Sequence, residues 1–157
     1  MIITQTVEYA LRAMVMLAYN RGEAMTVQEI AKVTRAPAPY LSKLMQGLVR
    51  ARLVRSRRGQ GGGFTLAGAP DEITIWDIVQ AVDPIERIEH CPLEIKGHSS
   101  LCALHRRLDE AIASVEGAFR KSTLAEMVAE SPPAGPLCRE SSGDPIVPLG
   151  LPKQKGK

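Results

Sequence analysis

Apolar residues recur at three- and four-residue steps along several parts of the chain, which is the spacing of one face of a helix. The first such part predicts a helix from about Thr6 to Asn20. A second, short helix is expected after Thr26, because Thr26 and Glu29 have the spacing of a capping box. Pro39 suits the first turn of a third helix, which is expected to end near Ala51.

Only a few residues separate the second and third helices, and the third has a basic outer face. Its apolar side holds Leu41, Leu44, Met45 and Leu48, whereas the residues on the other side are Ser42, Lys43, Gln46 and Arg50. Two short helices joined by a tight turn, the second one basic, indicate a helix-turn-helix. In that motif the second helix reads the major groove of DNA.

A short β-hairpin is predicted next. Strand-like runs at Leu53–Ser56 and Phe64–Leu66 flank a loop that begins with Arg57, Arg58 and Gly59 and continues with further glycines. Glycine allows a positive φ and lets the backbone approach another surface closely. Two arginines at such a tip can reach phosphates or a narrow minor groove. A nucleotide-binding P-loop is disfavoured, because no Lys-Ser or Lys-Thr pair and no helix follow the glycines.

The rest of the chain predicts three more helices and a tail. Thr74 is expected to cap a helix that ends at Val82, a long helix follows Cys102, and Thr123 opens a short last helix. From Ser131 onward Pro, Gly, Ser and Lys dominate, which predicts disorder. The expected fold is mainly α with a small β-hairpin. It comprises a winged helix-turn-helix DNA-binding domain (1–83), a cysteine-containing sensor loop (84–102), a dimerisation helix with a short terminal helix (103–130), and a disordered tail (131–157).

The long helix has an apolar stripe that so small a domain has no room to cover. The stripe consists of Leu104, Leu108, Ala111, Ile112, Val115 and Phe119. The simplest cover is the same helix of a second copy, which would make a symmetric homodimer. A dimer would present two recognition helices to half-sites about one DNA turn apart.

The net charge of +3 conceals an uneven distribution. Residues 31–70 contain no Asp or Glu, and their basic residues are Lys32, Arg35, Lys43, Arg50, Arg52, Arg55, Arg57 and Arg58. A solvated face would mix signs, so charges of one sign favour a polyanionic partner. We therefore expect a transcription regulator that binds double-stranded DNA. The alternative is a winged-helix module that binds another protein. An enzyme is not expected, since no nucleophile–base motif appears.

The compartment follows from what the sequence lacks. No stretch approaches the roughly 20 apolar residues of a transmembrane helix, and the first residues do not have the pattern of a secretory signal. We expect a cytoplasmic protein with no membrane partner. Its three cysteines, Cys91, Cys102 and Cys138, are an odd number, and in a reducing compartment they are free thiols or metal ligands. Cys138 lies in the predicted tail and is expected to be a bystander.

Several short segments match a known pattern. They are Glu8–Ala13, Ile30-Ala31, Tyr40–Leu44, Arg58–Phe64 and Ile75–Val82. Together they resemble the Rrf2 family over about residues 1–129, and the motif that ends in three glycines is fairly specific. The resemblance implies a dimeric winged-helix transcription factor, and we expect it to be a repressor. The family includes an iron–sulfur assembly regulator and a nitric-oxide-responsive repressor.

The resemblance also implies where DNA is contacted. It places Pro39, Tyr40, Ser42 and Lys43 at the DNA-facing start of the recognition helix, with a half-buried packing role as the alternative for Tyr40. It places Arg58 at the wing, where the family reaches the minor groove. The neighbouring Arg57 and Gly59 are also candidate DNA-binding residues.

A sensor is implied as well, with a departure from the family pattern. Cluster-binding relatives carry three cysteines in the loop before the long helix, whereas here Cys91 and Cys102 match only the first and the last. Substitute ligands are His98, His105, and Glu8 supplied by the first helix of the partner subunit. Two thiolates with His or carboxylate ligands suit a [2Fe–2S] cluster or zinc. A thiol switch or no cofactor at all remain alternatives, since cysteine is often simply buried.

Overall fold

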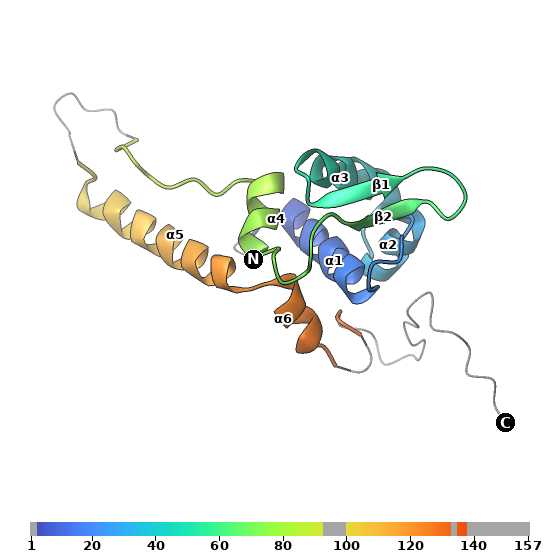
Figure 1. Ribbon diagram of the computed structural model, residues 1–157. Helices are drawn as coiled ribbons and strands as arrows, with labels where there is room; N and C mark the ends of the chain where they lie inside the picture. The colour runs from blue at the N-terminus through green and yellow to red at the C-terminus, as the bar shows by residue number, and fades with distance from the viewer. Residues whose placement is uncertain (1–2, 93–99, 133–134, 138–157) are drawn as a thin grey trace.

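The computed structural model describes residues 3–92, 100–132 and 135–137. The elements in chain order are α1 (Gln5–Tyr19), α2 (Val27–Thr34), α3 (Ala38–Arg50), β1 (Val54–Arg57), β2 (Gly63–Leu66), α4 (Ile75–Val82), α5 (Ala103–Lys121) and α6 (Leu124–Ala129). Figure 1 shows a head, made of α1–α4, the hairpin and α6, and an arm, made of α5 and the segment 83–92 that leads toward it. The prediction of a mainly helical winged helix-turn-helix with one long extra helix is confirmed, with element bounds within one or two residues of those expected.

The helix starts follow from threonine caps. Thr26 with Glu29, Thr74 with Asp77, and Thr123 with Glu126 each form a complete capping box, and the Thr4 hydroxyl accepts a hydrogen bond from the Val7 amide. Each box satisfies backbone donors that the first turn of a helix leaves without partners. These local signals explain why the sequence predicts the helix starts well.

The core of the head is aliphatic and centres on α1, which packs against α2, α3, α4 and α6. The largest fully buried side chains come from five helices and one strand: Met14, Met16, Leu17, Ile30, Leu41, Met45, Leu48, Ile78, Leu124 and Val54. Trp76 is also buried. The head therefore has its own closed core, on which α3 and the wing are mounted.

The wing is tied to the helix-turn-helix at its base. β1 and β2 pair antiparallel, with Val54 opposite Leu66 and Arg57 opposite Gly63. Phe64 in β2 also exchanges two backbone hydrogen bonds with Met25, at 3.0 and 2.8 Å. Gly63 has φ +152°, and a Cβ there would lie 2.6 Å from the Met25 carbonyl oxygen. Only glycine fits this close approach.

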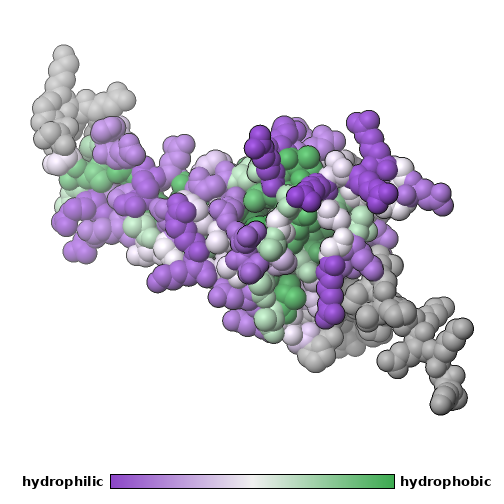
Figure 2. All heavy atoms as spheres, in the orientation of Figure 1, coloured by the Kyte–Doolittle hydropathy of each residue, from purple (hydrophilic) through white to green (hydrophobic). Residues whose placement is uncertain are grey.

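The arm is built differently. α5 has 19 residues and none of them is buried. Leu104 is 63% exposed and Leu108 48% exposed, and Figure 2 shows hydrophobic surface at this outer end of the arm. No helix among the described residues is long and apolar enough to cross a membrane.

The C-terminal end of α5 is where the arm joins the head. The Ile75 amide donates to the Ser122 carbonyl at 2.9 Å, the Leu124 amide donates to the Ile73 carbonyl at 2.9 Å, and the Arg120 guanidinium lies over the Trp76 ring. At 1.5 Å per residue, α5 carries its first residue about 28 Å away from this junction.

Little of the expected tail is described. Of residues 131–157, the structure describes 131–132 and 135–137, and Leu137 packs against the core of the head. Cys138, and His98 of the sensor loop, lie outside the described residues.

Candidate nucleic-acid interface and metal centre

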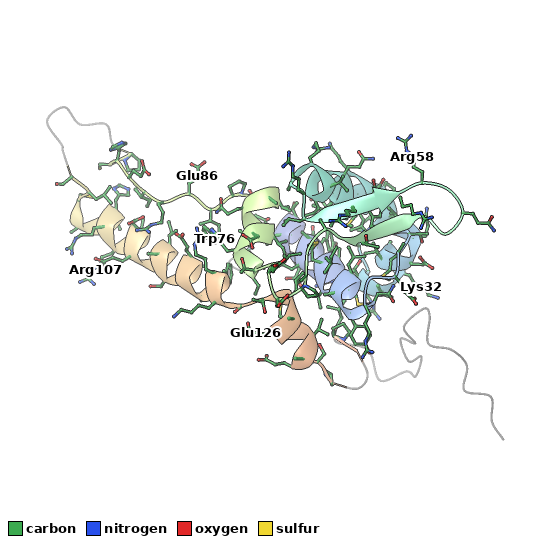
Figure 3. The ribbon with its side chains drawn as sticks, in the orientation of Figure 1. Lys32, Arg58, Trp76, Glu86, Arg107 and Glu126 are labelled. Atoms are coloured by element: carbon green, nitrogen blue, oxygen red, sulfur yellow. The ribbon has the colours of Figure 1, made fainter. Side chains whose placement is uncertain are left out.

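The candidate DNA-binding residues lie on two neighbouring elements of the head. Pro39, Tyr40 and Lys43 are exposed in the first turns of α3, and Ser42 is half-buried. Arg57, Arg58 and Gly59 are all exposed on the wing. Figure 3 shows the Arg58 side chain directed away from the wing. The structure thus presents both groups of predicted residues to solvent on elements with the order and size of a DNA-reading unit.

Four basic side chains of this surface have no ion-pair partner in the part of the chain that the structure describes. Among the described residues, no salt bridge involves Lys43, Arg55, Arg57 or Arg58. The ion pairs of Arg106, Arg107 and Arg120 all lie on α5. Unpaired basic side chains on α3 and the wing suit a phosphate backbone.

Tyr40 has a structural partner that the sequence did not reveal. Its hydroxyl is hydrogen-bonded to the Thr6 hydroxyl, and its ring meets Tyr9 edge-on, with centroids 5.9 Å apart. The side chain is still 41% exposed. Tyr40 thus connects the start of α3 to α1, as the packing alternative expected, while its contact with DNA stays a prediction.

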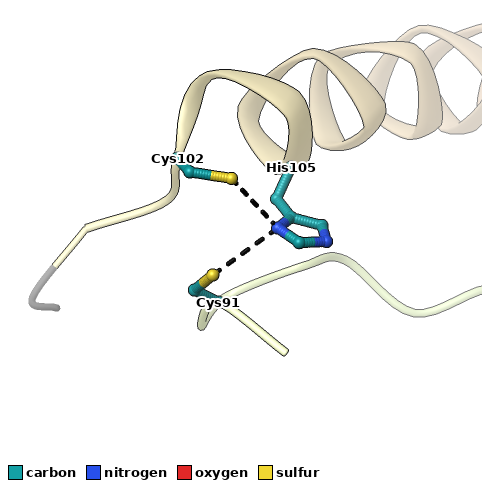
Figure 4. A group of neighbouring side chains, drawn as sticks. All are labelled: Cys91, Cys102 and His105. Atoms are coloured by element: carbon teal, nitrogen blue, oxygen red, sulfur yellow. Dashed lines mark hydrogen bonds between the residues drawn. The ribbon is translucent and has the colours of Figure 1, made fainter. Parts of the chain in front are cut away.

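Cys91, Cys102 and His105 come together at the outer end of the arm (Figure 4). The His105 Nδ1 lies 3.5 Å from the Cys91 Sγ and 3.2 Å from the Cys102 Sγ. All three ligand atoms lie within 4.8 Å of one another; Cys91 is buried and the other two are half-buried. Cys91 is eleven positions before Cys102 and fourteen before His105, so two separate segments of the chain form one potential ligand set.

The position of Cys102 favours its thiolate. Cys102 is the N-cap of α5. Its pKa lies below the ordinary value, chiefly because the backbone amide of His105 in the first turn stabilises the negative sulfur; desolvation opposes this effect. A thiolate, rather than a thiol, is the form that binds metal ions.

Two further predicted ligands are not in this group. Glu8 forms a salt bridge with Arg12 at 2.8 Å, and Arg12 also donates to the Thr34 carbonyl at 3.1 Å. Glu8 therefore lies on α1 in the head, apart from the cysteines of its own chain. The sequence had suggested it as a ligand for the site of the partner subunit. The role of Glu8 stays a prediction, as does that of His98.

The chemistry of the donor set fits a metal ion or cluster. In a tetrahedral zinc site, bonds of about 2.3 Å to sulfur and 2.0–2.1 Å to nitrogen put neighbouring ligand atoms roughly 3.5–3.8 Å apart. The two sulfur–nitrogen distances of 3.5 and 3.2 Å are close to that spacing. Mixed Cys/His ligation is also known for [2Fe–2S] centres. Three of four ligand positions are therefore accounted for within one chain.

The segment before Cys91 is fastened to α5 by an ion pair that was not expected from the sequence. The Arg87 guanidinium donates to both Asp109 carboxylate oxygens, at 2.7 and 2.6 Å, and the Ile88 amide donates to the same carboxylate at 2.9 Å. These bonds lower the pKa of Asp109 to about 2, with the Arg87 hydrogen bonds as the main cause. The one hint in the sequence was the position of Asp109 four residues after His105, which places both side chains on the same face of a helix.

Comparison with known proteins agrees with this architecture. The family model of Rrf2, described as an iron-dependent transcriptional regulator, matches residues 3–130. An HTH-type transcriptional regulator of Aquifex aeolicus (strain VF5) is 37% identical over 132 residues, which cover 82% of this chain and 92% of that protein.

Two solved structures are also similar. The global cysteine regulator CymR of B. subtilis has a TM-score of 0.69 at 25% identity, covering 84% of this chain and 99% of that one. The IscR of T. potens has a TM-score of 0.68 at 26% identity, covering 83% and 88%.

The fold defines a winged-helix protein of the transcription-regulator class. The chain belongs to the Rrf2 family of transcriptional regulators. The members of this family are regulators rather than enzymes, in line with the sequence.

Proposed function

We propose that this protein is a cytoplasmic, sequence-specific DNA-binding repressor. The observation that carries the proposal is the exposed basic surface that runs from the start of α3 to the wing without an acidic partner among the described residues. Lys43 would contact phosphates or base edges in the major groove. Arg57 and Arg58 would enter the minor groove, and Gly59 would let the wing backbone approach the phosphates.

The active form is a homodimer that pairs through α5. Leu104 and Leu108 support this, because a helix with exposed leucines in an apolar stripe gains stability when a second copy covers it. Within one chain, no residue of α5 is buried by the rest of the described structure. Two heads joined in this way would read two half-sites.

The group Cys91, Cys102 and His105 holds the sensor, for which a [2Fe–2S] cluster is the leading candidate. The cluster would supply redox and nitric-oxide chemistry when bound. Cys91 belongs to the segment that starts at α4, whereas Cys102 and His105 belong to the far end of α5. Ligation by all three residues would add a second connection between the segment and the helix and so hold the angle between each head and the dimer axis. A single zinc ion is the second candidate, favoured by the short sulfur–nitrogen distances.

Three experiments test this function. Selection from genomic DNA with the purified protein should enrich a roughly palindromic duplex, and affinity should fall about 10³–10⁵-fold between roughly 50 and 200 mM salt if about 6–10 phosphates are neutralised. Arg58→Ala should cost about 1–3 kcal/mol on that duplex. Failure to enrich any duplex would instead favour a protein-binding module.

The visible spectrum of protein purified without oxygen separates a cluster, which absorbs, from zinc, which does not.

A further inference from the structure

The contact between Arg87 and Asp109 differs from an ordinary surface ion pair. Exposed pairs contribute little, since water and salt screen them. Here the Asp109 side chain is only 16% exposed, and its carboxylate accepts three hydrogen bonds, two from the Arg87 guanidinium and one from the Ile88 amide. Bidentate guanidinium–carboxylate pairs fix geometry as well as charge. The carboxylate therefore holds both a side chain and the backbone of the connecting segment.

The position of this contact along the two chain segments is the second observation. Asp109 follows His105 by four residues in α5, so the two lie one helical turn apart on the same face. On the connecting segment, Arg87 and Ile88 precede Cys91 by four and three residues. The ion pair and the Cys–His group are thus consecutive contacts between the same segment and the same helix.

The segment has no other regular structure to place Cys91. Between α4 and Cys91 the chain forms neither helix nor strand, and its backbone is otherwise tied to the head by the Gln80 side chain, which donates to the Ile85 carbonyl at 2.9 Å. Ordering such a segment costs backbone conformational entropy for every residue that becomes fixed. A contact that orders it beforehand would remove this cost from ligand binding.

We propose that Asp109, through Arg87 and Ile88, is the positioning residue that keeps Cys91 within reach of Cys102 and His105 before any metal or cluster is bound. The inference rests on the proposed Cys91–Cys102–His105 sensor site. It adds to that site a residue that does not touch the ligand. Removal of the Asp109 carboxylate leaves Arg87 with its longer pair to Glu116, at 3.9 Å, which does not hold the Ile88 backbone. The segment can then leave α5, and the two thiols separate.

The experiment uses the full chain with Cys138→Ser, which leaves two thiols, and the probe is phenylarsine oxide. This trivalent arsenical exchanges its oxygen for two thiol sulfurs: two As–S bonds form, one water is released, and arsenic keeps its oxidation state. Tight binding therefore needs both thiols close together, and no native ligand is involved. We expect the parent to bind one probe per chain. The affinity of Asp109→Ala for the probe should be lower by about tenfold or more, and that of Asp109→Asn should lie between the two. This effect is at the low end of the 10–100-fold range for outer-shell residues of metal sites.

The matched control is Glu110→Ala, which removes an exposed carboxylate from the next position of α5 and breaks its pairs with Arg106 and Arg107. It should bind the probe like the parent. Thermal unfolding of the head should be the same in all these variants, so a loss of probe binding reports the position of Cys91. Equal probe affinity in the parent, Asp109→Asn and Asp109→Ala would overturn the proposal, and so would an equal loss in Glu110→Ala.

A Co²⁺ titration separates this inference from the proposed function. The parent should give thiolate-to-cobalt absorption that Cys91→Ser abolishes, and Asp109→Ala should need more Co²⁺ to reach it. If the parent binds the arsenical but no Co²⁺ and no cluster, the metal sensor fails while the role of Asp109 stands. If Cys91→Ser binds the arsenical as well as the parent does, the two thiols are not neighbours and both proposals fall.

Discussion

The head and the arm of this protein have similar helices that are stabilised in different ways. α1 has 15 residues and buries eight of them, whereas α5 has 19 and buries none. Both have an apolar stripe at helical spacing. The head is therefore specified by its own core, while the arm depends on a few polar contacts, on its junction with α4 and α6, and on the second copy that we propose.

The two parts of the proposed function, DNA binding and sensing, fall on different parts of the molecule. The proposed DNA-binding side chains project from the head, whose packed core sets their spacing. The sensor residues lie about 28 Å from the junction of α5 with the head, at the end of a lightly held arm. A site placed there can change the arm without unfolding the head, which is what a switch requires.

The largest effect should come from a charge in the α5 stripe. Leu108→Glu puts a carboxylate into the proposed dimer contact, so the protein should become monomeric and lose about 10²–10⁴-fold in operator affinity, the usual gain from two linked binding sites. Ser114→Glu is the control, because Ser114 is exposed on the same helix outside the stripe. Sedimentation velocity gives the mass. A Leu108→Glu protein that stays dimeric would show that α5 does not pair.

The next effect contrasts two leucine truncations. Leu48→Ala removes a fully buried side chain from the head and should lower the free energy of unfolding by about 2–5 kcal/mol. Leu104→Ala removes the same atoms from a side chain that is 63% exposed, and at monomer concentrations it should leave unfolding within about 0.5 kcal/mol of wild type. Urea titrations measure both. Equal losses would mean that the arm has a core of its own.

A smaller effect is expected within the wing. Gly63→Ala forces a Cβ against the Met25 carbonyl and should destabilise the head by about 1–3 kcal/mol. Gly61→Ala meets no atom within 4 Å, so it should cost only the strain of a positive φ, about 1–2 kcal/mol or less. Thermal unfolding gives the order. A larger loss at Gly61 would contradict the contact between β2 and Met25.

The smallest expected effect is the loss of the Arg87–Asp109 ion pair of the arm at low pH. Asp109 has a pKa of about 2 against an ordinary 3.8, so the contact with Arg87 is fully present above about pH 4 and is lost as pH falls toward 2. Carboxyl NMR shifts should show this midpoint, and Arg87→Ala should move the Asp109 pKa back toward 3.8. A midpoint near 3.8 in the wild type would mean that the pair does not persist in solution.

The elements were predictable because their signals are local. Threonine caps and apolar periodicity sit within a few residues of the structure that they specify, and the glycines mark the wing. The grouping of Cys91, Cys102 and His105 could be expected from residue type and a family resemblance. The contacts of Asp109 with Arg87 and of Tyr40 with Thr6 could not, because each depends on how two distant segments lie side by side.

Periodicity alone could not distinguish the two apolar stripes; the small size of the domain was the reason to expect that the stripe of α5 lies outside its core. Periodicity reports that a helix has an apolar face, but it does not report what covers that face. In α1 the cover is the rest of the head, and in α5 no described part of the chain buries it.

The central claim is that the cysteine–histidine group in the arm controls DNA binding by the head. It is tested most directly by the dissociation constant for the selected duplex, measured by fluorescence anisotropy without oxygen, before and after reconstitution with iron and sulfide. The wild type should change affinity at least about tenfold, equivalent to about 1.4 kcal/mol, whereas Cys102→Ser should give one value under both conditions. The same affinity for loaded and unloaded wild type, or an equal change in Cys102→Ser, would contradict the account.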